Sequence, residues 1–221
     1  MNEYVKINTI WKRDERGRVI EGDYATPELA FLADCRWEWT EKVDGTNIGV
    51  SWDGAGGVEF GGRTDNAQLH AGLVSALRDM FGDKRLFEEK FGDTPTVLYG
   101  EGYGAGIQKG GGNYSPDKTF VLFDVKCGAW WLRREAVLDV AAHFNLRTVP
   151  VLMVGTLAEA LERTKAGITS TWGEFQAEGM VGRPLGTELF ARNGERIIVK
   201  MKTRDFPAPS TPPRAAREET P

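Results

Sequence analysis

The segment Lys42-Val43-Asp44-Gly45-Thr46-Asn47-Ile48-Gly49-Val50-Ser51-Trp52 contains the pattern on which the fold and the chemistry of this chain depend. From residue 48 to residue 52, large apolar side chains alternate with small ones, which is the period of a β-strand with one buried face. A turn with three glycines follows at residues 53–57, and Val58 and Phe60 continue as a return strand. Residues 37–63 are therefore predicted to form a β-hairpin.

The rest of the chain mixes helix and strand patterns. Leu69, Leu73, Leu77 and Met80 recur at helical spacing and predict an amphipathic helix over residues 66–81. Further strands are predicted at residues 96–101, 119–126, 149–154 and 196–202, and further helices at 133–144 and 157–165. Because strands and helices do not alternate strictly as βαβ units, these patterns predict an α+β fold.

Composition limits the class of protein. The chain has 221 residues, of which 41% are hydrophobic and 27% charged, enough for one large domain or two small ones. It lacks an apolar run of the roughly 18 residues that a membrane span needs, and its N-terminus lacks the apolar stretch of a signal peptide. Cys35 and Cys127 lie far apart in sequence, which leaves a bridge open but favours a reduced, cytoplasmic protein.

The formal net charge of −4 does not resemble that of a strongly basic nucleic-acid-binding domain. Contact with nucleic acid therefore requires local basic patches, and the alternative for each basic residue is an ordinary solvated surface. The candidates are Lys6, Lys12, Arg13, Arg16 and Arg18 near the start, and Lys109 and Lys118 in a glycine-rich loop.

Lys42 is the candidate nucleophile. With an ordinary pKa near 10.4, only about one lysine in a thousand is neutral near pH 7.4, so attack on phosphorus requires a lowered pKa. We expect Lys200 and Lys202 to supply the cationic field that lowers it. Asp44, two residues on, is expected to share a strand face with Lys42 and to orient the amine or accept its proton. The alternative is a surface Lys–Asp pair before a turn.

Lys200 and Lys202 lie two residues apart in the predicted strand 196–202, so both point to one face, opposite Val199 and Met201. Two neighbouring ammonium groups repel each other, and an anion such as a triphosphate would hold them together. The alternative for this strand alone is an edge strand protected by lysines.

Four other side chains suit a nucleotide. Glu101 follows a predicted strand, where its carboxylate would accept hydrogen bonds from a ribose. Phe123 offers a platform for a purine ring, and Glu178 offers hard oxygen ligands for Mg²⁺. The planar fork of Arg63 suits phosphate, and the predicted hairpin brings it near Lys42. The alternatives are a loop-rim acid, a core aromatic, a strand flank and a surface arginine.

These segments together resemble the covalent nucleotidyltransferase superfamily of polynucleotide ligases and mRNA capping enzymes. The similarity covers about residues 38–203 and follows the order of motifs I, III, IIIa, IV and V. The matching segments are Lys42-Val43-Asp44-Gly45, Tyr99-Gly100-Glu101-Gly102, Leu122-Phe123-Asp124, Glu178-Gly179-Met180-Val181 and Val199-Lys200-Met201-Lys202. Lys42–Asn47 and the loop Gly106-Ile107-Gln108-Lys109-Gly110 look most like ATP-dependent RNA ligases of the T4 RNA ligase 2 type.

The resemblance implies a ligase-type domain of antiparallel sheets flanked by helices. It also implies that Lys42 attacks the α-phosphate of ATP, that AMP passes to a 5′-phosphate end of RNA, possibly in a nicked duplex, and that a 3′-hydroxyl then seals the strand. ATP and Mg²⁺ or Mn²⁺ are the implied cofactors, with Glu178 on the metal. The implied catalytic residues are Lys42, Asp44, Arg63, Lys200 and Lys202. The implied nucleotide-binding residues are Glu41, Lys42, Asn47, Arg63, Glu101, Phe123, Glu178, Lys200 and Lys202, with Asp124 a less certain member.

The chain departs from larger relatives after motif V, because only 19 residues follow Lys202. We expect a nucleotidyltransferase domain over residues 1–206, a disordered proline-rich tail over 207–221, no C-terminal OB-fold domain, and a monomer. Three alternatives stay open: a minimal DNA ligase, a GTP-using capping guanylyltransferase, and a nucleotide- or RNA-binding module without transfer activity.

Overall fold

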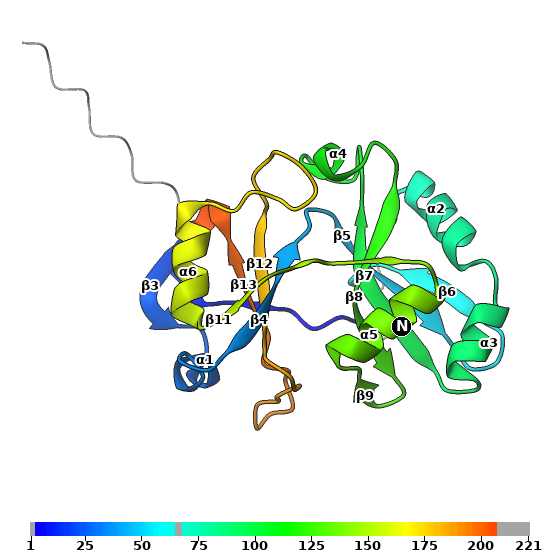
Figure 1. Cartoon of the computed structure of the whole chain (residues 1–221), viewed down its shortest axis with the longest axis horizontal. Helices are drawn as coiled ribbons and strands as arrows, with labels where there is room; N and C mark the ends of the chain where they lie inside the picture. The colour runs from blue at the N-terminus through cyan, green and yellow to red at the C-terminus, as the bar shows by residue number, and fades with distance from the viewer. Residues whose placement is uncertain (1–2, 65–67, 207–221) are drawn as a thin grey trace, which may run out of the picture.

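The computed structural model describes residues 3–64 and 68–206. Two β-sheets lie side by side, and helices cover each of them (Figure 1). The predicted α+β fold with antiparallel sheets and flanking helices is confirmed, although two of the strand pairs, β1 with β13 and β10 with β8, are parallel. The predicted tail and the start of the predicted helix 66–81 lie partly or wholly outside the described residues.

The first sheet has the strand order β1-β13-β12-β4-β11. Its strands are β1 (Asn8–Thr9), β13 (Val199–Lys202), β12 (Gly179–Pro184), β4 (Trp37–Lys42) and β11 (Val151–Gly155). Helices α1 (Pro27–Phe31) and α6 (Leu157–Ala166) pack near it, and β2 (Trp11–Arg13) forms a small separate hairpin with β3 (Val19–Tyr24). Trp37 and Trp39 of β4 are fully buried, and their indole groups donate to the carbonyls of Leu32 and Gly155. Each indole therefore buries a large apolar surface without leaving its N–H unpaired.

The second sheet has the order β10-β8-β7-β5-β6, with β9 on the edge of β8. Its strands are β10 (Arg147–Thr148), β8 (Thr119–Cys127), β7 (Thr96–Tyr103), β5 (Thr46–Trp52), β6 (Val58–Gly61) and β9 (Trp130–Trp131). Helices α2 (Ala71–Phe81), α3 (Arg85–Phe91) and α5 (Arg134–His143) share an aromatic-rich core with it. A short helix, α4 (Gly111–Tyr114), ends the glycine-rich loop, and a 3-10 turn, η1 (Thr203–Asp205), follows β13.

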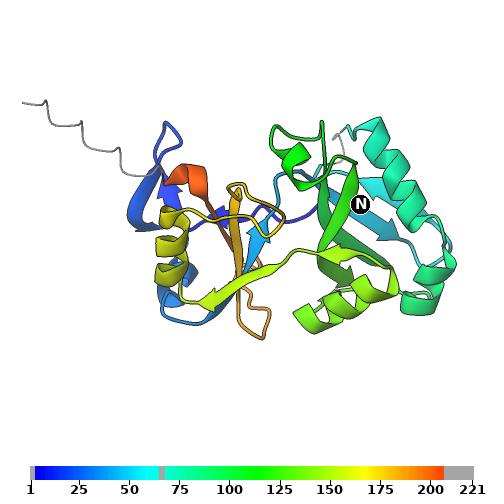
Figure 2. The ribbon, with the colours of Figure 1, turned by 45° about the horizontal axis from the view of Figure 1, so that its top comes forward.

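The predicted hairpin over residues 37–63 is half wrong. Strands β5 and β6 do form a hairpin, but β4 pairs with β11 and β12 in the other sheet. Residues 43–45 therefore carry the chain from one sheet to the other, and Lys42 lies at this crossing. Gly45 is required there, because a Cβ at this position would overlap the carbonyl oxygen of Gly102. A second crossing runs from β10 to β11, as Figure 2 shows.

Most other predicted elements are present with shifted ends. The predicted helix 66–81 begins at Ala71, and the predicted strand 196–202 begins at Val199. The sequence patterns missed α3, whose seven residues are too few to show a clear period, and the small β2–β3 hairpin. Cys35 and Cys127 are both free thiols.

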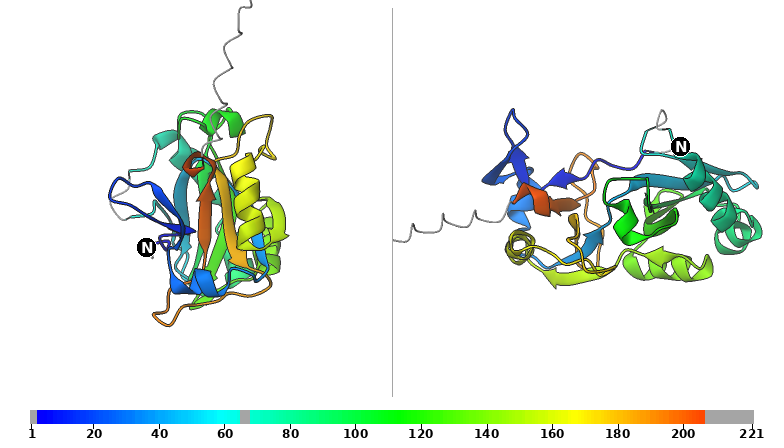
Figure 3. Two further views of the ribbon diagram at one scale, coloured as in Figure 1. Left: turned by 90° about the vertical axis from the view of Figure 1, so that its left-hand side faces the viewer. Right: turned by 90° about the horizontal axis from the view of Figure 1, so that it is seen from above.

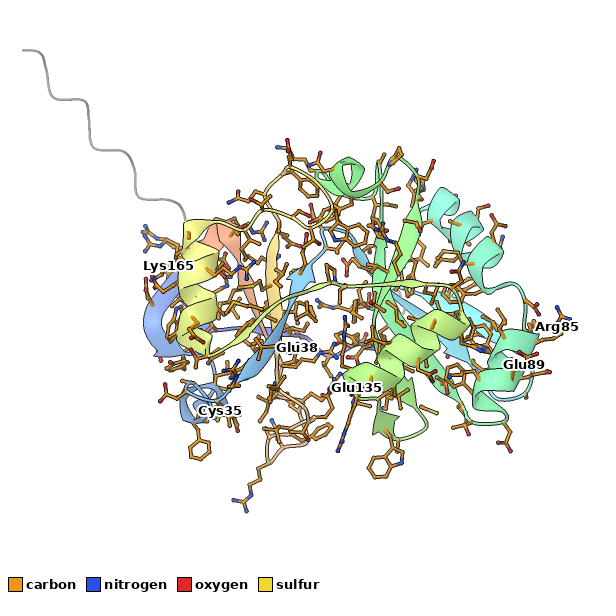
Figure 4. The ribbon with its side chains drawn as sticks, viewed as in Figure 1. Cys35, Glu38, Arg85, Glu89, Glu135 and Lys165 are labelled. Carbon is orange, nitrogen blue, oxygen red and sulfur yellow. The ribbon has the colours of Figure 1, made fainter. Side chains whose placement is uncertain are left out.

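The helices turn their charged sides away from the sheets. Figure 4 shows Arg85 and Glu89 on the outer side of α3 and Lys165 on the outer side of α6, whereas Glu38 and Glu135 lie between the two halves. Within residues 3–64 and 68–206, no helix has the length and apolar character needed to cross a membrane.

Candidate active site

A cavity of about 500 Å³ lies between the two sheets and takes residues from both. It contains eight of the ten residues predicted for the site. These are Glu41, Lys42, Asn47, Arg63, Glu101, Phe123, Lys200 and Lys202. The other two, Asp44 and Glu178, line a second cavity of about 240 Å³ beside it. The structure therefore brings together segments that are up to 160 residues apart in the chain (42 to 202).

The Glu178 carboxylate pairs with both Lys42 and Lys202. Its Oε2 atom accepts from Lys42 Nζ at 2.7 Å, and its Oε1 atom pairs with Lys202 Nζ at 2.6 Å. Strand pairing explains the contact, because Gly179 lies opposite Lys42 on one side and opposite Lys202 on the other. A Cβ at Gly179 would overlap the carbonyl oxygen of Met201, so the close approach of β12 and β13 here requires glycine. Burial opposes ionisation of Glu178, but Lys42 and Lys202 outweigh it and lower its pKa.

Our expectation for the pKa of Lys42 is wrong for the protein without nucleotide. Burial acts to lower this pKa, but the negative charges of Glu101, Glu178 and Asp44 outweigh it, so the pKa is raised. The sequence argument counted the two nearby lysines and overlooked that Glu178 neutralises Lys202. Lys42 is thus held as an ammonium ion in the protein without nucleotide.

Lys200 is the lysine whose pKa is lowered, to about 8, by burial and by the charges of Lys202, Lys42 and Arg63. Within the described residues, it has no carboxylate at ion-pair distance. Val199 and Met201 are buried in the core of the first sheet on the opposite face, as the strand period predicted. Lys200 therefore supplies uncompensated positive charge to the cavity, which suits a ligand that carries phosphate.

The first expected result concerns Lys200→Met. Below pH 8 the wild type carries the cost of a charge in a poorly solvated place, and methionine removes it. Between pH 8 and 10.5 the unfolded chain binds more protons than the folded protein, so wild-type stability rises with pH and the difference closes. After allowance for solvent screening, we expect the variant to be more stable by about 1–2 kcal/mol at pH 7. Thermal unfolding at pH 7 and pH 10 measures this.

Lys84→Met, at an exposed lysine, is the matched control and should change stability little at either pH. If Lys200→Met lowered the melting temperature at pH 7, the charge of Lys200 would be stabilising, contrary to this account.

Glu101 and Asn47 lie side by side across β7 and β5, so their side chains point to the same face of the sheet. Burial is the main cause that raises the pKa of Glu101 to about 7. The charges of Glu178 and Asp44 add to it, and Lys42 opposes it. The carboxyl group is thus close to half protonated at neutral pH. A ribose hydroxyl can use it as an acceptor in either state.

The second expected result concerns Glu101→Gln. Between pH 4.5 and 7 the folded protein binds more protons than the unfolded chain, so wild-type stability falls as pH rises through this window. The variant lacks this cost and should be more stable than the wild type by about 2 kcal/mol at pH 8, with little difference at pH 4.5. Urea unfolding at both pH values measures it. Glu59→Gln, at an exposed residue of β6, is the control, and equal effects of the two variants would contradict the assignment.

Asp44 does not share a strand face with Lys42. Strand β4 ends at Lys42, and Asp44 lies in the crossing bend, where its carboxylate points toward Gly110. It still contributes to the charge around Lys42. The shared face was predicted on the assumption that the strand continues past Lys42, but the strand ends there.

Glu41 lines the cavity, but its buried carboxylate already accepts hydrogen bonds from the protein. Ser170 Oγ donates to one oxygen at 2.5 Å, and the backbone N–H and hydroxyl of Thr171 donate to the other. This side chain fastens the loop between α6 and β12 beside Lys42. A role for Glu41 in nucleotide binding stays a prediction. Because its carboxylate is occupied, the contact would be made by its backbone.

Phe123 and Arg63 take the predicted positions in the cavity lining, with Arg63 exposed at its mouth. Asp124, the next residue after Phe123, is fully buried and turns away. It accepts from Tyr4 Oη at 2.8 Å and from Arg196 at 2.6 Å, and pairs with Arg183 at 3.2 Å. Asp124 therefore holds three segments together behind the cavity.

Several lining residues were missed by the sequence analysis: Tyr4, Val5, Ile7, Thr40, Val149, Val181 and Arg183. Val181 lay within a quoted motif, three residues after Glu178, which was a usable signal. Tyr4, Val5 and Ile7 carried no signal, because their place depends on the long-range pairing of the N-terminal segment.

A divalent ion at Glu178 fits only as a shared ligand. Within the described residues, no three His, Cys, Asp or Glu side chains gather closely enough to hold an ion alone. Mg²⁺ commonly takes one or two carboxylates and fills its shell with phosphate oxygens and water. The Glu178 carboxylate already faces two ammonium groups, which repel a bare cation, so an ion would bind here only together with phosphate groups that pair with the lysines.

Comparison with known proteins agrees with this geometry. The family described as RNA ligase matches residues 36–202. This chain belongs to the RNA ligase family. The match begins one residue before β4 and ends at Lys202. It therefore includes the strands of both sheets that carry the predicted site residues. Comparison of the sequence with curated proteins gave no match.

Solved RNA ligases have the same fold at low sequence identity. Naegleria gruberi RNA ligase R4a, as a lysine-to-alanine variant without ligand, aligns with a TM-score of 0.61 and 21% identity over 81% of this chain and 53% of that one. The Naegleria gruberi RNA ligase with PPi gives 0.63 and 19% over 92% and 62%. A variant of that ligase with ATP and Mn gives 0.62 and 19% over 91% and 61%. The chain thus spans between half and two thirds of the length of these ligases.

Proposed function

We propose that the protein is an ATP-dependent RNA ligase that forms a covalent lysyl-AMP intermediate on Lys42. The observation that carries the proposal is the ion-paired group of Lys42, Glu178 and Lys202, whose two lysines line a cavity together with Asn47, Glu101 and Phe123. Family membership supports joining of RNA, and a family relative has been solved with ATP and Mn. ATP and Mg²⁺ or Mn²⁺ are therefore the proposed cofactors.

The first step makes one bond and breaks one. The neutral amine of Lys42 forms a nitrogen–phosphorus bond with the α-phosphate, and the bond from that phosphorus to the bridging oxygen of pyrophosphate breaks. Lys42 must first lose a proton, and Glu178 Oε2, at 2.7 Å, is the nearest acceptor. Lys200 and Lys202 would stabilise negative charge on the α-phosphate, and Arg63 would assist at the mouth. A metal ion, when bound by Glu178 and the phosphates, would supply further charge neutralisation.

The two remaining steps transfer AMP from Lys42 to the RNA and then seal the strand. The 5′-phosphate of an RNA strand takes AMP from Lys42, and a 3′-hydroxyl then displaces AMP. The formal net charge of −4 means that RNA must meet a local basic surface, for which Lys109, Lys118 and the N-terminal basic residues remain candidates.

A joining assay tests the substrate. Nicked duplexes and single strands made of RNA, DNA or both are incubated with ATP and Mg²⁺, and joined product is measured on a denaturing gel. We expect joining of RNA 3′-hydroxyl ends. Joining of all-DNA nicks at the same rate would favour the minimal DNA ligase, and a covalent adduct with GTP instead of ATP would favour the capping enzyme. Nucleotide binding without any adduct would favour the binding module.

A further inference from the structure

The N-terminal segment runs between the two sheets, from Tyr4 on the second sheet to β1 on the first, as the view from above in Figure 3 shows. Tyr4 is buried against the second sheet. Its hydroxyl donates to Asp124, and its ring meets Phe123 edge-on at 5.1 Å between centroids. Trp131 packs edge-on against the same tyrosine. This end of the segment is therefore fixed, and it touches the aromatic platform of the cavity.

The other end is fixed to the first sheet. Thr9 of β1 pairs with Lys200 of β13, and paired residues on neighbouring strands point to the same face. Residues at alternate positions of an extended segment share a face, which places Ile7 on the side of Lys200. Val5 and Ile7 do line the cavity, whereas Lys6 between them is exposed.

The cavity is lined by both apolar and charged side chains. Phe123, Val149 and Val181 line it together with Val5 and Ile7, and so do the three cations Lys42, Lys200 and Lys202. A nucleotide matches such a mixed lining, with its base against apolar side chains and its phosphates at the lysines. Val5 and Ile7 offer only apolar contact, so they would touch the base or the sugar and not the phosphates.

We propose, on the basis of the nucleotidyl transfer argued above, that residues 4–9 form one wall of the nucleoside site and that Ile7 contacts the bound nucleoside directly. Tyr4 is a positioning residue that acts through Phe123. The N-terminal segment therefore sets nucleotide affinity, although it precedes the first of the family motifs.

Binding of the unreactive analogue α,β-methylene-ATP tests this proposal. Ile7→Ala removes three carbons from the apolar wall. We expect it to raise the dissociation constant about tenfold in isothermal titration calorimetry. With ATP, KM for adduct formation should rise by a similar factor while kcat changes less than twofold. Asn8→Ala, at the next exposed position, whose side chain does not line the cavity, should leave both values unchanged.

A purely structural role for Ile7 would lower the melting temperature without changing the dissociation constant of the folded protein, and that result would overturn the proposal. Hydrogen exchange of the wild-type protein gives a second measurement, independent of any variant. Peptides that cover residues 4–9 should gain protection when the analogue binds, and unchanged exchange there would also overturn it.

The proposal and the proposed function fail in different ways. If the wild type binds the analogue and Ile7→Ala weakens binding, but ATP yields no adduct, the wall stands and the transfer activity does not. If the wild type does not bind the analogue at all, both are overturned.

Discussion

Lys42→Ala is expected to reduce joining of a 5′-phosphate RNA strand with ATP by about four to six orders of magnitude, the loss seen when a covalent nucleophile is removed. The variant lacks the amine of Lys42, which pairs with Glu178, so no phosphoramide can form at this position. Joining of a strand that already carries AMP on its 5′-phosphate needs no lysine nucleophile. That reaction should fall at most about a hundredfold, the cost of one charge-stabilising group.

The two substrates separate the roles of Lys42. A denaturing gel with each strand measures both rates, and Lys84→Ala, at an exposed lysine, serves as the control. Equal losses on both substrates would mean that Lys42 mainly organises the site. Retained joining with ATP would remove it from the mechanism.

Asp124→Ala is expected to destabilise the fold by about 3–5 kcal/mol, because it removes the carboxylate shared by the buried guanidinium of Arg196 and the mostly buried guanidinium of Arg183. The side chains of Asp124 and Arg196 are 0% and 1% exposed. Tyr4 would also lose the acceptor for its buried hydroxyl. Urea unfolding at pH 7 measures the change in the free energy of unfolding.

Asp139→Ala is the matched control. Asp139 pairs with Lys90 on the surface, where its side chain is 70% exposed, and such pairs contribute about 0–1 kcal/mol. Equal effects of the two variants would show that the buried charges around Asp124 are solvated or compensated in some other way. Asp124→Ala should also weaken binding of the ATP analogue, because Tyr4 and Phe123 lose their support.

Much of the fold and of the site could be predicted from local patterns, because such patterns depend only on residues that are neighbours in the sequence. The alternation in β5 and the two-residue spacing of Lys200 and Lys202 are such patterns, and the structure has both as predicted. The match of Glu101 to Asn47 across two strands follows from the same kind of pattern plus the sheet register.

The failures have one physical origin, which is long-range pairing. The sequence of β4 does not reveal that its partners are β11 and β12, so the crossing at residues 43–45 and the displacement of Asp44 were missed. The pKa of Lys42 was predicted in the wrong direction because Glu178 had been placed on the metal alone. In the structure it also pairs with both Lys42 and Lys202. The N-terminal wall was missed because β1 joins a strand 190 residues away (9 to 199).

Intact mass measurement of the wild-type protein after incubation with ATP and Mg²⁺, followed by peptide mapping, tests the central claim most directly. We expect a mass increase of one AMP, located on Lys42, that disappears when pyrophosphate is added. No adduct with either Mg²⁺ or Mn²⁺, or an adduct on another residue, would contradict the account.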